Sequence, residues 1–406
     1  IEEFGKQLSS IDMENNKICA LVLPNGVDMA ISFLALANYV TVSPLNPNYT
    51  KEEFLFFLED LDCEFIITDN SASNSLLEAA KQLKIKLFYL NNYSPKNRLS
   101  IKSLSTPSKC LLDQNKADDI CLILHTSGTT SRPKQVQLSC MNIISSALNI
   151  AGVLQLEKKD KGMNIMPLFH IHGLIASLLS SIVTGSSVVC TSGFNALTFY
   201  GNIKSFKPTW ITAVPTMYQA ILSRASRNKE IIQASSLRLL RSSSAAMPVA
   251  TIEALENAFQ CPVIEAYGMT EASHQMASNF LDSIRKPGSV GKSAGPEIAL
   301  LRDNKLITSA NTVGEIVIRG LNVTKGYKNN DKANKENFFD GWFKTGDLGK
   351  FDEDGFLFIS GRIKEIINKG GEKISPQEVD EALMKHEEVF QAVCFSVKHE
   401  KLGEDI

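Results

Sequence analysis

A run of small polar residues followed by a lysine is the clearest chemical pattern in the chain. An apolar segment, 120–124, leads into Thr126, Ser127, Gly128, Thr129 and Thr130, and Lys134 follows. Hydroxyls and backbone N–H groups around a glycine can wrap a phosphate, because no bulky side chain blocks its approach. Lys134 adds a point charge for the same phosphate. We therefore predict a polyphosphate loop. The alternative is an ordinary Ser/Thr-rich surface turn, and the spacing of a Walker loop is absent.

A second pattern joins an apolar strand to an aromatic ring and a carboxylate. Residues 263–271 read Val-Ile-Glu-Ala-Tyr-Gly-Met-Thr-Glu. Tyr267 could stack on a purine, Thr270 could contact an α-phosphate, and Glu271 could offer a hard oxygen ligand to Mg²⁺. A Thr-Glu pair alone is also typical of a helix N-terminus. The pattern predicts a purine pocket at Glu265, Ala266, Tyr267, Gly268 and Met269.

A third pattern is the glycine-bounded segment 341–349, which places Asp347 in a predicted turn. A carboxylate in such a turn can accept two hydrogen bonds from ribose hydroxyls, as carboxylates do in many nucleotide sites. Isolated Thr-Gly-Asp sequences are also common as plain turns. We predict that Asp347 binds ribose.

Two weaker patterns place polar side chains beside strand ends. His170 and His172 lie in 166–173, after a short strand, while the predicted strand 237–240 ends in a loop that holds Ser243 and Ser244. Open α/β sheets bind ligands where strands end in such loops. The serine loop could also be a solvent turn, and a bare histidine pair is more often structural.

Strand and helix patterns alternate in the first third of the chain. Strands are predicted at 18–23, 40–45 and 64–68, with helices at 27–39 and 51–61. This alternation predicts a parallel sheet covered by helices, hence an α/β fold. A helix at 140–153 could face the bound anion with its N-terminus. Near the chain end, the pattern predicts a helix at 376–383 and a strand at 389–397.

Composition narrows the class of protein. At 406 residues, the chain is too long for a single core. Its 44% apolar and 21% charged residues are ordinary for a globular protein, and a net charge of −2 gives no reason to expect nucleic acid. Eight scattered cysteines fit reduced thiols, and no apolar run predicts a membrane span. The chain starts without Met and stops in what reads as an unfinished domain, so we expect a partial chain at both ends.

Several runs together resemble the adenylate-forming, AMP-binding superfamily of acyl-CoA synthetases. They are Thr-Ser-Gly-Thr-Thr-Ser-Arg-Pro-Lys, Glu-Ala-Tyr-Gly-Met-Thr-Glu, Gly-Trp-Phe-Lys-Thr-Gly-Asp and Gly-Arg-Ile-Lys-Glu. The resemblance spans 126–376. The chain departs from the family pattern at Ser131 and Gln135, where the family usually has Gly, and at Gly361, where it has Asp. Pro-Leu-Phe-His-Ile-His-Gly-Leu, Met-Thr-Glu-Ala-Ser-His and Lys-Pro-Gly-Ser-Val-Gly-Lys are most similar to the oxalate–CoA ligase group.

The resemblance implies an ATP-dependent acid–CoA ligase. The carboxylate of a small-molecule acid would attack the α-phosphate of Mg-ATP, giving an acyl-adenylate and pyrophosphate, and the CoA thiol would then displace AMP. The implied catalytic residues are Lys134, His172, Thr270 and Glu271, with Glu271 holding Mg²⁺. Arg362 would join Asp347 at the ribose.

The resemblance also implies an architecture. A large α/β domain of stacked subdomains would span 1–361, and 362–406 would begin a small α+β lid. Lys364 would lie at the hinge, with Gly370 and Gly371 on the CoA side. A second catalytic lysine would belong beyond the last residue of this chain.

The acid is expected to be oxalate or another very short dicarboxylate. His170, His172, Ser243, Ser244 and His274 would surround it, and His274 would share a helical face with Glu271 if that segment is helical. A nearby anion should keep such histidines charged. The alternatives are a medium-chain or aryl acyl-CoA synthetase, a carrier-loading adenylation domain, or a non-catalytic nucleotide-binding paralogue. We expect a cytoplasmic location, with the peroxisome as the alternative.

Overall fold

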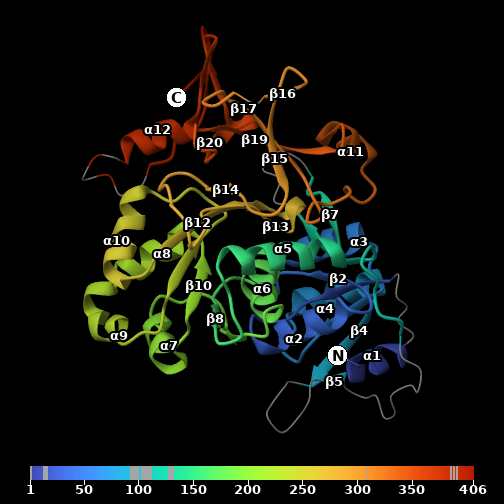
Figure 1. Cartoon of the computed structure of the whole chain (residues 1–406). Coiled ribbons are helices and arrows are strands. Elements are labelled where there is room, and N and C mark those ends of the chain that lie inside the picture. The colour runs from blue at the N-terminus through green and yellow to red at the C-terminus, as the bar shows by residue number, and fades with distance from the viewer. Residues whose placement is uncertain are drawn as a thin grey trace.

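Two seven-stranded sheets and two smaller sheets form the molecule (Figure 1). The computed structural model describes residues 2–11, 17–91, 100–101, 112–126, 132–307, 309–384, 386, 389 and 392–406. Four residues of the predicted phosphate loop, Ser127, Gly128, Thr129 and Thr130, lie outside this described part, as does Ser131.

The first sheet has the order β5-β4-β3-β1-β2-β6-β7, with antiparallel outer strands and a parallel centre. This confirms the predicted parallel sheet with its helices. A capping box between Thr50 and Glu53 starts α3 at the predicted residue. The elements are α1 (Glu2–Ser9), β1 (Ile18–Leu21), α2 (Val27–Leu36), β2 (Thr41–Pro44), α3 (Lys51–Leu61), β3 (Phe65–Thr68), α4 (Asn74–Leu83), β4 (Lys86–Asn91), β5 (Ser100–Ile101), β6 (Ile120–His125) and β7 (Gln135–Ser139).

The second sheet has the order β14-β13-β12-β11-β10-β8-β9, and its strands β8 to β12 run parallel. Helices α7 to α10 lie on its outer side (Figure 1). The elements are α5 (Cys140–Val153), β8 (Lys161–Asn164), the π-helix η1 (His172–Leu179), α6 (Ser180–Ile182), β9 (Ser187–Cys190), α7 (Phe199–Phe206), β10 (Trp210–Ala213), α8 (Pro215–Leu222), η2 (Ala225–Asn228), α9 (Lys229–Gln233), β11 (Leu239–Ser242), α10 (Val249–Phe259), β12 (Val263–Met269), η3 (Thr270–Ala272), β13 (His274–Ser278) and β14 (Lys292–Ser293).

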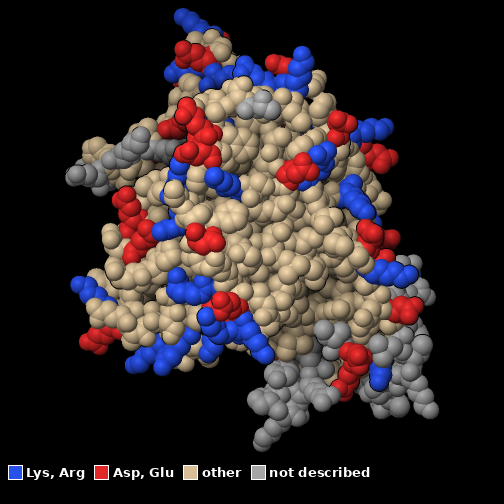
Figure 2. Space-filling model, viewed as in Figure 1, with Lys and Arg blue, Asp and Glu red and all other residues tan. Residues whose placement is uncertain are grey.

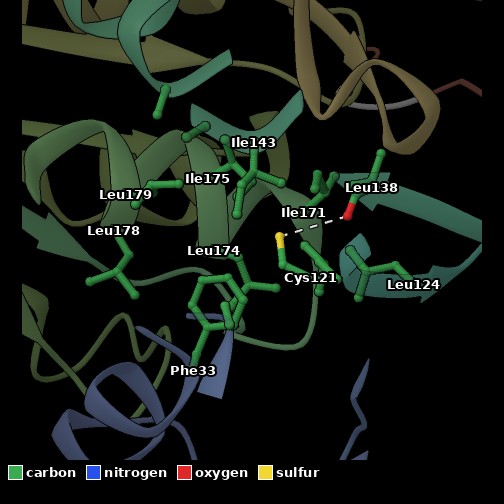
Figure 3. Close-up of a cluster of buried hydrophobic side chains, with 14 of the residues drawn as sticks. Phe33, Cys121, Leu124, Leu138, Ile143, Ile171, Leu174, Ile175, Leu178 and Leu179 are labelled. Atoms are coloured by element: carbon green, nitrogen blue, oxygen red, sulfur yellow. Dashed lines mark hydrogen bonds between the residues drawn. The ribbon is translucent and has the colours of Figure 1, made fainter. Parts of the chain in front are cut away.

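A layer made of α5 and η1 joins the two large sheets. Helix α5 contacts β6 and β7 on one side and β13 on the other, and η1 packs against α5 and β8. Figure 3 shows Ile143 of α5 meeting Leu174 and Ile175 of η1, beside Cys121 of β6. Burying these apolar side chains is worth about 25 cal/mol per Å². The layer therefore fixes how the two sheets sit on each other.

Helix α5 lies where it was predicted, but its N-terminus does not follow the phosphate loop directly. Strand β7 comes between them and pairs antiparallel with β6. The first N–H groups of α5 already have partners, because those of Cys140 and Met141 donate to the carbonyls of Asp119 and Ala117, and that of Asn142 donates to Ser139 Oγ. The expectation that this helix end faces the bound anion is therefore wrong.

The third sheet is antiparallel, with the order β16-β15-β17-β19-β18 and β20 beside β19. Asp347 lies within β19 and pairs with Arg362 of β20, so the predicted turn is a strand. Gly346, with φ of 76°, supplies the local bend. The elements are β15 (Glu297–Arg302), β16 (Lys305–Ile307), β17 (Gly314–Arg319), α11 (Asp331–Asn337), β18 (Phe338–Phe339), β19 (Trp342–Phe351) and β20 (Leu357–Arg362).

The last sheet has the order β22-β21-β24-β23. It follows the end of β20, and α12 contacts β20 (Figure 1). The helix predicted at 376–383 is confirmed, but the strand predicted at 389–397 is wrong, because residues 392–396 form no strand. The elements are η4 (Ile363–Glu365), β21 (Ile367–Lys369), β22 (Glu372–Ile374), α12 (Pro376–Leu383), β23 (Val397–His399) and β24 (Gly403–Asp405).

The face shown in Figure 2 mixes Lys and Arg with Asp and Glu around a centre of uncharged residues. This face offers no extended field of one sign that would attract a polyanion. Within the described residues, no helix is both long enough and apolar enough to cross a bilayer.

Candidate active site

A cavity of about 660 Å³ opens where strands of both large sheets end. Its walls come from the ends of β6, β11 and β12, the start of η1, and from β19 and β20 of the third sheet. Such a position, beyond the carboxyl ends of parallel strands, is where open α/β sheets bind ligands.

The predicted phosphate loop joins the antiparallel strands β6 and β7 as a hairpin, and both of its ends are described. The backbone N–H of Thr126 donates to the carbonyl of Lys134 at 3.0 Å, and the N–H of Lys134 donates to Thr126 Oγ1 at 3.2 Å. Both residues line the cavity. Partial burial lowers the pKa of Lys134, and the Glu271 carboxylate opposes that shift.

Asp60, in α3, holds both ends of this hairpin. Its carboxylate contacts His125 Nε2 at 3.1 Å, Arg132 at 2.6 Å and the side-chain amide of Gln135 at 2.8 Å. Gln135 stands where the family pattern has Gly, and its amide nitrogen also donates to the Asp60 carbonyl at 2.5 Å. The larger side chain therefore adds an anchor for the loop.

Glu271 is buried and shares its surroundings with Tyr327, a residue that the sequence analysis missed. The Tyr327 hydroxyl donates to Glu271 Oε1 at 2.8 Å, and Lys134 Nζ lies 4.5 Å from the centre of the Tyr327 ring. Burial raises the pKa of Glu271, while Tyr327 and Lys134 lower it. The only signal available in the sequence was an aromatic residue, Tyr327, directly after Gly326.

The described residues contain no group of three or more His, Cys, Asp or Glu side chains that could hold a metal by itself. A lone carboxylate fits Mg²⁺, because this ion keeps several waters and is usually held by one or two carboxylates together with substrate phosphates. Glu271, on the cavity wall near Lys134, would be that ligand.

The five residues predicted to hold the purine, Glu265 to Met269, all line the cavity. The Tyr267 hydroxyl donates to Asp347, and Arg362 Nε lies 3.2 Å from Asp347 Oδ1. Burial raises the pKa of Asp347, and Tyr267 and Arg362 oppose that shift. Burial also raises the pKa of Glu265 to about 8, although the Gly288 N–H donates to it at 3.1 Å. Glu265 is therefore largely protonated at neutral pH.

His172 and His274 meet at the far end of the cavity, with ring centres 4.8 Å apart. His172 Nδ1 lies 3.0 Å from Ser244 Oγ, and its Nε2 lies 2.7 Å from Thr212 Oγ1. Gly173 follows His172 and packs closely against Pro167. A Cβ at this position would overlap the Pro167 carbonyl, so the backbone next to His172 needs a glycine. We call this part of the cavity the acid end, because it holds the residues predicted to bind the acid.

Strained backbone marks the same end. Ser244 has φ of 75° and His274 has φ of 94°, a region that side-chain-bearing residues rarely adopt. Such strain persists only where surrounding contacts enforce it, and it gathers at functional sites.

Three expectations about the acid end are corrected. Residues 270–272 form a short 3-10 turn and His274 begins β13, so His274 and Glu271 do not share a helical face. Burial, with a contribution from Arg241, lowers the pKa of both His172 and His274 well below the usual value, so both are neutral. The Ser243 hydroxyl donates to the Ala266 carbonyl at 2.8 Å and serves the fold, not the cavity.

The remaining predicted residues divide between the cavity and the surface. Thr270, exposed His170 and Lys364 line the cavity. Gly370 and Gly371 form the turn between β21 and β22 and are not among the cavity residues.

Arg241 is a second residue, after Tyr327, that the sequence analysis missed. It was assigned to a loop, but β11 continues to Ser242, so its side chain enters the core and is fully buried. The guanidinium donates to Thr212 Oγ1 at 3.2 Å and to Gln275 Oε1 at 3.1 Å, and it lies 3.5 Å from His274 Nδ1. The available signal was an arginine directly after the two leucines Leu239 and Leu240 that begin β11.

Known proteins resemble this chain over nearly its whole length. The family model described as AMP-binding enzyme matches residues 1–328. An oxalate–CoA ligase of Arabidopsis thaliana is 45% identical over 99% of this chain and 80% of its own length. The oxalate–CoA ligase of Saccharomyces cerevisiae is 40% identical, over 95% and 75%. The solved structure of ATP-bound MatB from Rhodopseudomonas palustris superposes with a TM-score of 0.89 at 27% identity, covering 99% of this chain and 80% of that one.

Proposed function

This chain belongs to the AMP-binding enzyme family, and from that premise we propose that it is an ATP-dependent acid–CoA ligase that converts oxalate to oxalyl-CoA. Its fold is that of the adenylate-forming enzymes, as the resemblance predicted. The observation that carries the choice of acid is the polar end of the cavity, where His172, His274 and Ser244 converge.

The reaction would proceed in two displacements. An oxalate oxygen would form a bond to the α-phosphorus of ATP while the bond to the bridging oxygen breaks, and pyrophosphate would leave with the electron pair. The thiolate of CoA would then attack the acyl carbon, and AMP would leave. Bound Mg²⁺ would neutralise charge on the phosphates.

The residues of this chain would act mainly by positioning and by fixed charge. Lys134 would stabilise the charge that develops on the phosphates, and Glu271 would hold the metal. Tyr267 would stack on the purine, and protonated Glu265 would offer it a donor. Asp347 and Arg362 would bind the ribose, with Thr270 at the α-phosphate.

We also propose that the large domain ends at residue 361 and that 362–406 begins the mobile lid. Gly361 supports a hinge here, because its φ of 130° suits glycine and a Cβ would lie 2.7 Å from Ser375 Oγ. Lys364 would sit at the hinge, and Gly370 with Gly371 would reach the CoA side after the lid rotates.

The polar acid end of the cavity fits a short dicarboxylate better than a fatty acid. A pocket whose buried polar groups are arranged for a carboxylate rejects an acid that leaves them unpaired. His274 Nε2 is buried and has no hydrogen-bond partner among the described residues, so an uncharged acyl chain would leave it unsatisfied.

A second candidate is supported by the apolar part of the wall. Met166, Phe169, Val214 and Met247 also line the cavity and could contact an aliphatic or aryl acid. The choice between the two candidates is an experimental one.

The test is AMP and pyrophosphate formation with oxalate, malonate, acetate, octanoate and coumarate. We expect oxalate to have the highest kcat/KM, and His274→Ala to lower it for oxalate by about 10-fold or more. His386→Ala is the matched control, because His386 is exposed and does not line the cavity. Faster turnover of octanoate or coumarate would favour the second candidate. ATP binding without pyrophosphate release for any acid would favour a non-catalytic paralogue.

A further inference from the structure

We propose that Arg241 is a positioning residue that sets which nitrogen of His172 and His274 carries the proton, and that its charge makes the acid end select dianionic acids. The inference rests on the proposed function, since it concerns the same acid. Arg241 does not line the cavity, so it would act through its neighbours.

The first step is that Arg241 is a buried cation without a counter-charge in the described part of the chain. Its side chain is 0% exposed, and its partners Thr212, Gln275 and His274 are all neutral. Burial lowers its pKa only to about 9, so it stays charged at neutral pH. A buried charge is costly unless it is compensated, and Arg241 Nε also has no hydrogen-bond partner in the described part of the chain. An anion in the neighbouring cavity would supply the compensation.

The second step concerns His274. A guanidinium can only donate, so His274 Nδ1 must accept from Arg241, which leaves the proton on Nε2. Gln275 is a separate partner of the same guanidinium, because its Oε1 accepts from Arg241 at 3.1 Å while its amide nitrogen donates to the Ala294 carbonyl. His274 therefore presents an N–H that no described group accepts.

The third step concerns His172. Thr212 Oγ1 accepts from Arg241, so the hydroxyl can turn its own proton toward His172 Nε2. If His172 instead donated there, the buried Thr212 hydroxyl would have no acceptor among the described residues, which costs about 1–3 kcal/mol for an unsatisfied group. The proton of His172 then lies on Nδ1 and is donated to Ser244.

The hydrogen bonds from Arg241 lead to two residues that line the cavity, Ser244 and His274. Ser244 is exposed and accepts from His172, so its own O–H is free to donate, and His274 Nε2–H has no acceptor among the described residues. The Arg241 guanidinium thus acts on both histidines, on His274 directly and on His172 through Thr212. A second carboxylate on the acid would meet both donors and the charge behind them.

The direct test is the tautomer state of the histidines, read by nitrogen NMR of histidine-labelled protein. The chain has only six histidines, so the signals can be assigned by substitution. We expect Nδ1–H at His172 and Nε2–H at His274. In Arg241→Gln the two tautomers should mix at both residues, and Arg241→Lys should restore part of the preference at one of them.

The kinetic test compares acids. Arg241→Gln should raise the KM for oxalate by about 10-fold to 100-fold, change the KM for acetate by less than about 3-fold, and leave the KM for ATP unchanged. Arg238→Gln is the matched control, because Arg238 lies on the same chain segment but pairs with Asp160 outside the cavity. It should affect stability without altering the ratio between acids.

Thr212→Val keeps the test decisive if Arg241→Gln does not fold. It should mix the tautomers of His172 alone. Unchanged tautomers in Arg241→Gln or in Thr212→Val, or an equal loss for oxalate and acetate, would overturn the inference. If the tautomers are as expected but oxalate is not a substrate, the proposed function fails while the positioning role stands.

Discussion

At the part of the cavity predicted to hold the nucleotide, here called the nucleotide end, each buried carboxyl group has a partner, whereas at the acid end a buried guanidinium faces only neutral side chains among the described residues. Glu271 accepts from Tyr327, Asp347 accepts from Tyr267, and Glu265 accepts from a backbone N–H. Arg241 has no such balance within the described residues. One end is therefore complete before ligand binds, and the other is left for an anion to complete.

Among the substitutions that test this contrast between the two ends, Glu271→Gln should have the largest effect. It removes the proposed metal ligand but keeps the side-chain volume, so pyrophosphate release should fall by about 10²-fold or more with every acid. Tyr327→Phe is the matched control, because it keeps the carboxylate and should cost much less. Equal rates of pyrophosphate release in wild type and Glu271→Gln would show that Glu271 is not a catalytic residue.

Asp347→Ala should weaken ATP binding by about 1.5–3 kcal/mol, because it removes a charged acceptor for the ribose hydroxyls. Calorimetry measures the effect, and the KM for the acid should not change. Asp303→Ala is the control, because that side chain is 92% exposed on the third sheet. Unchanged ATP affinity in Asp347→Ala would contradict the ribose assignment.

Gly173→Ala should disturb the acid end alone. The added Cβ would overlap the Pro167 carbonyl, so the start of η1 and His172 must shift, at a cost of about 1–3 kcal/mol in the free energy of unfolding. The KM for oxalate should rise while ATP affinity stays the same. Gly201→Ala, in α7 with open space around it, is the control and should not destabilise. A change in ATP affinity for Gly173→Ala would show that the ends are not separate.

The two ends should also respond oppositely to pH. Glu265 has a raised pKa of about 8, so the folded state binds its proton more tightly, and its contribution to stability is lost as pH rises from about 4.5 to 8. His274 has a lowered pKa, so its contribution is lost as pH falls below about 6.5. Each can reach about 1.4 kcal/mol per pH unit.

Denaturant unfolding of Glu265→Gln and His274→Gln across pH 5 to 8 measures these slopes, with wild type as reference. Relative to wild type, Glu265→Gln should gain stability as pH rises, and His274→Gln should gain it as pH falls. Parallel curves would mean that neither group titrates differently in the folded and unfolded chain.

The same contrast explains what could be predicted from the sequence. Each predicted nucleotide-binding residue belongs to a short run of neighbouring residues, so local patterns predicted Tyr267, Glu271 and Asp347, and all three line the cavity, although Asp347 lies in a strand instead of a turn. The acid end is assembled from separate elements. The partnership of Arg241, Thr212 and His274 depends on the order of strands β10, β11, β12 and β13, which no local pattern contains.

The burial of the two histidines is the other quantity that could not be predicted from the sequence. The sequence suggested charged histidines, because an anion nearby favours the charged form. The structure surrounds both rings with protein and places a guanidinium beside them, and the pKa of each falls. Desolvation depends on packing from several elements, so only the folded chain reveals it.

The attachment of the phosphate loop to α3 has a consequence for cooperativity. Asp60 lies one residue before the last residue of α3 and joins both ends of the loop hairpin. Fraying of that last helical turn would release the loop, so any ligand held by the loop favours the closed turn. Amide protons in the last turn of α3 should therefore exchange more slowly with ATP present, even though they belong to the outer layer of the first sheet and not to the cavity wall.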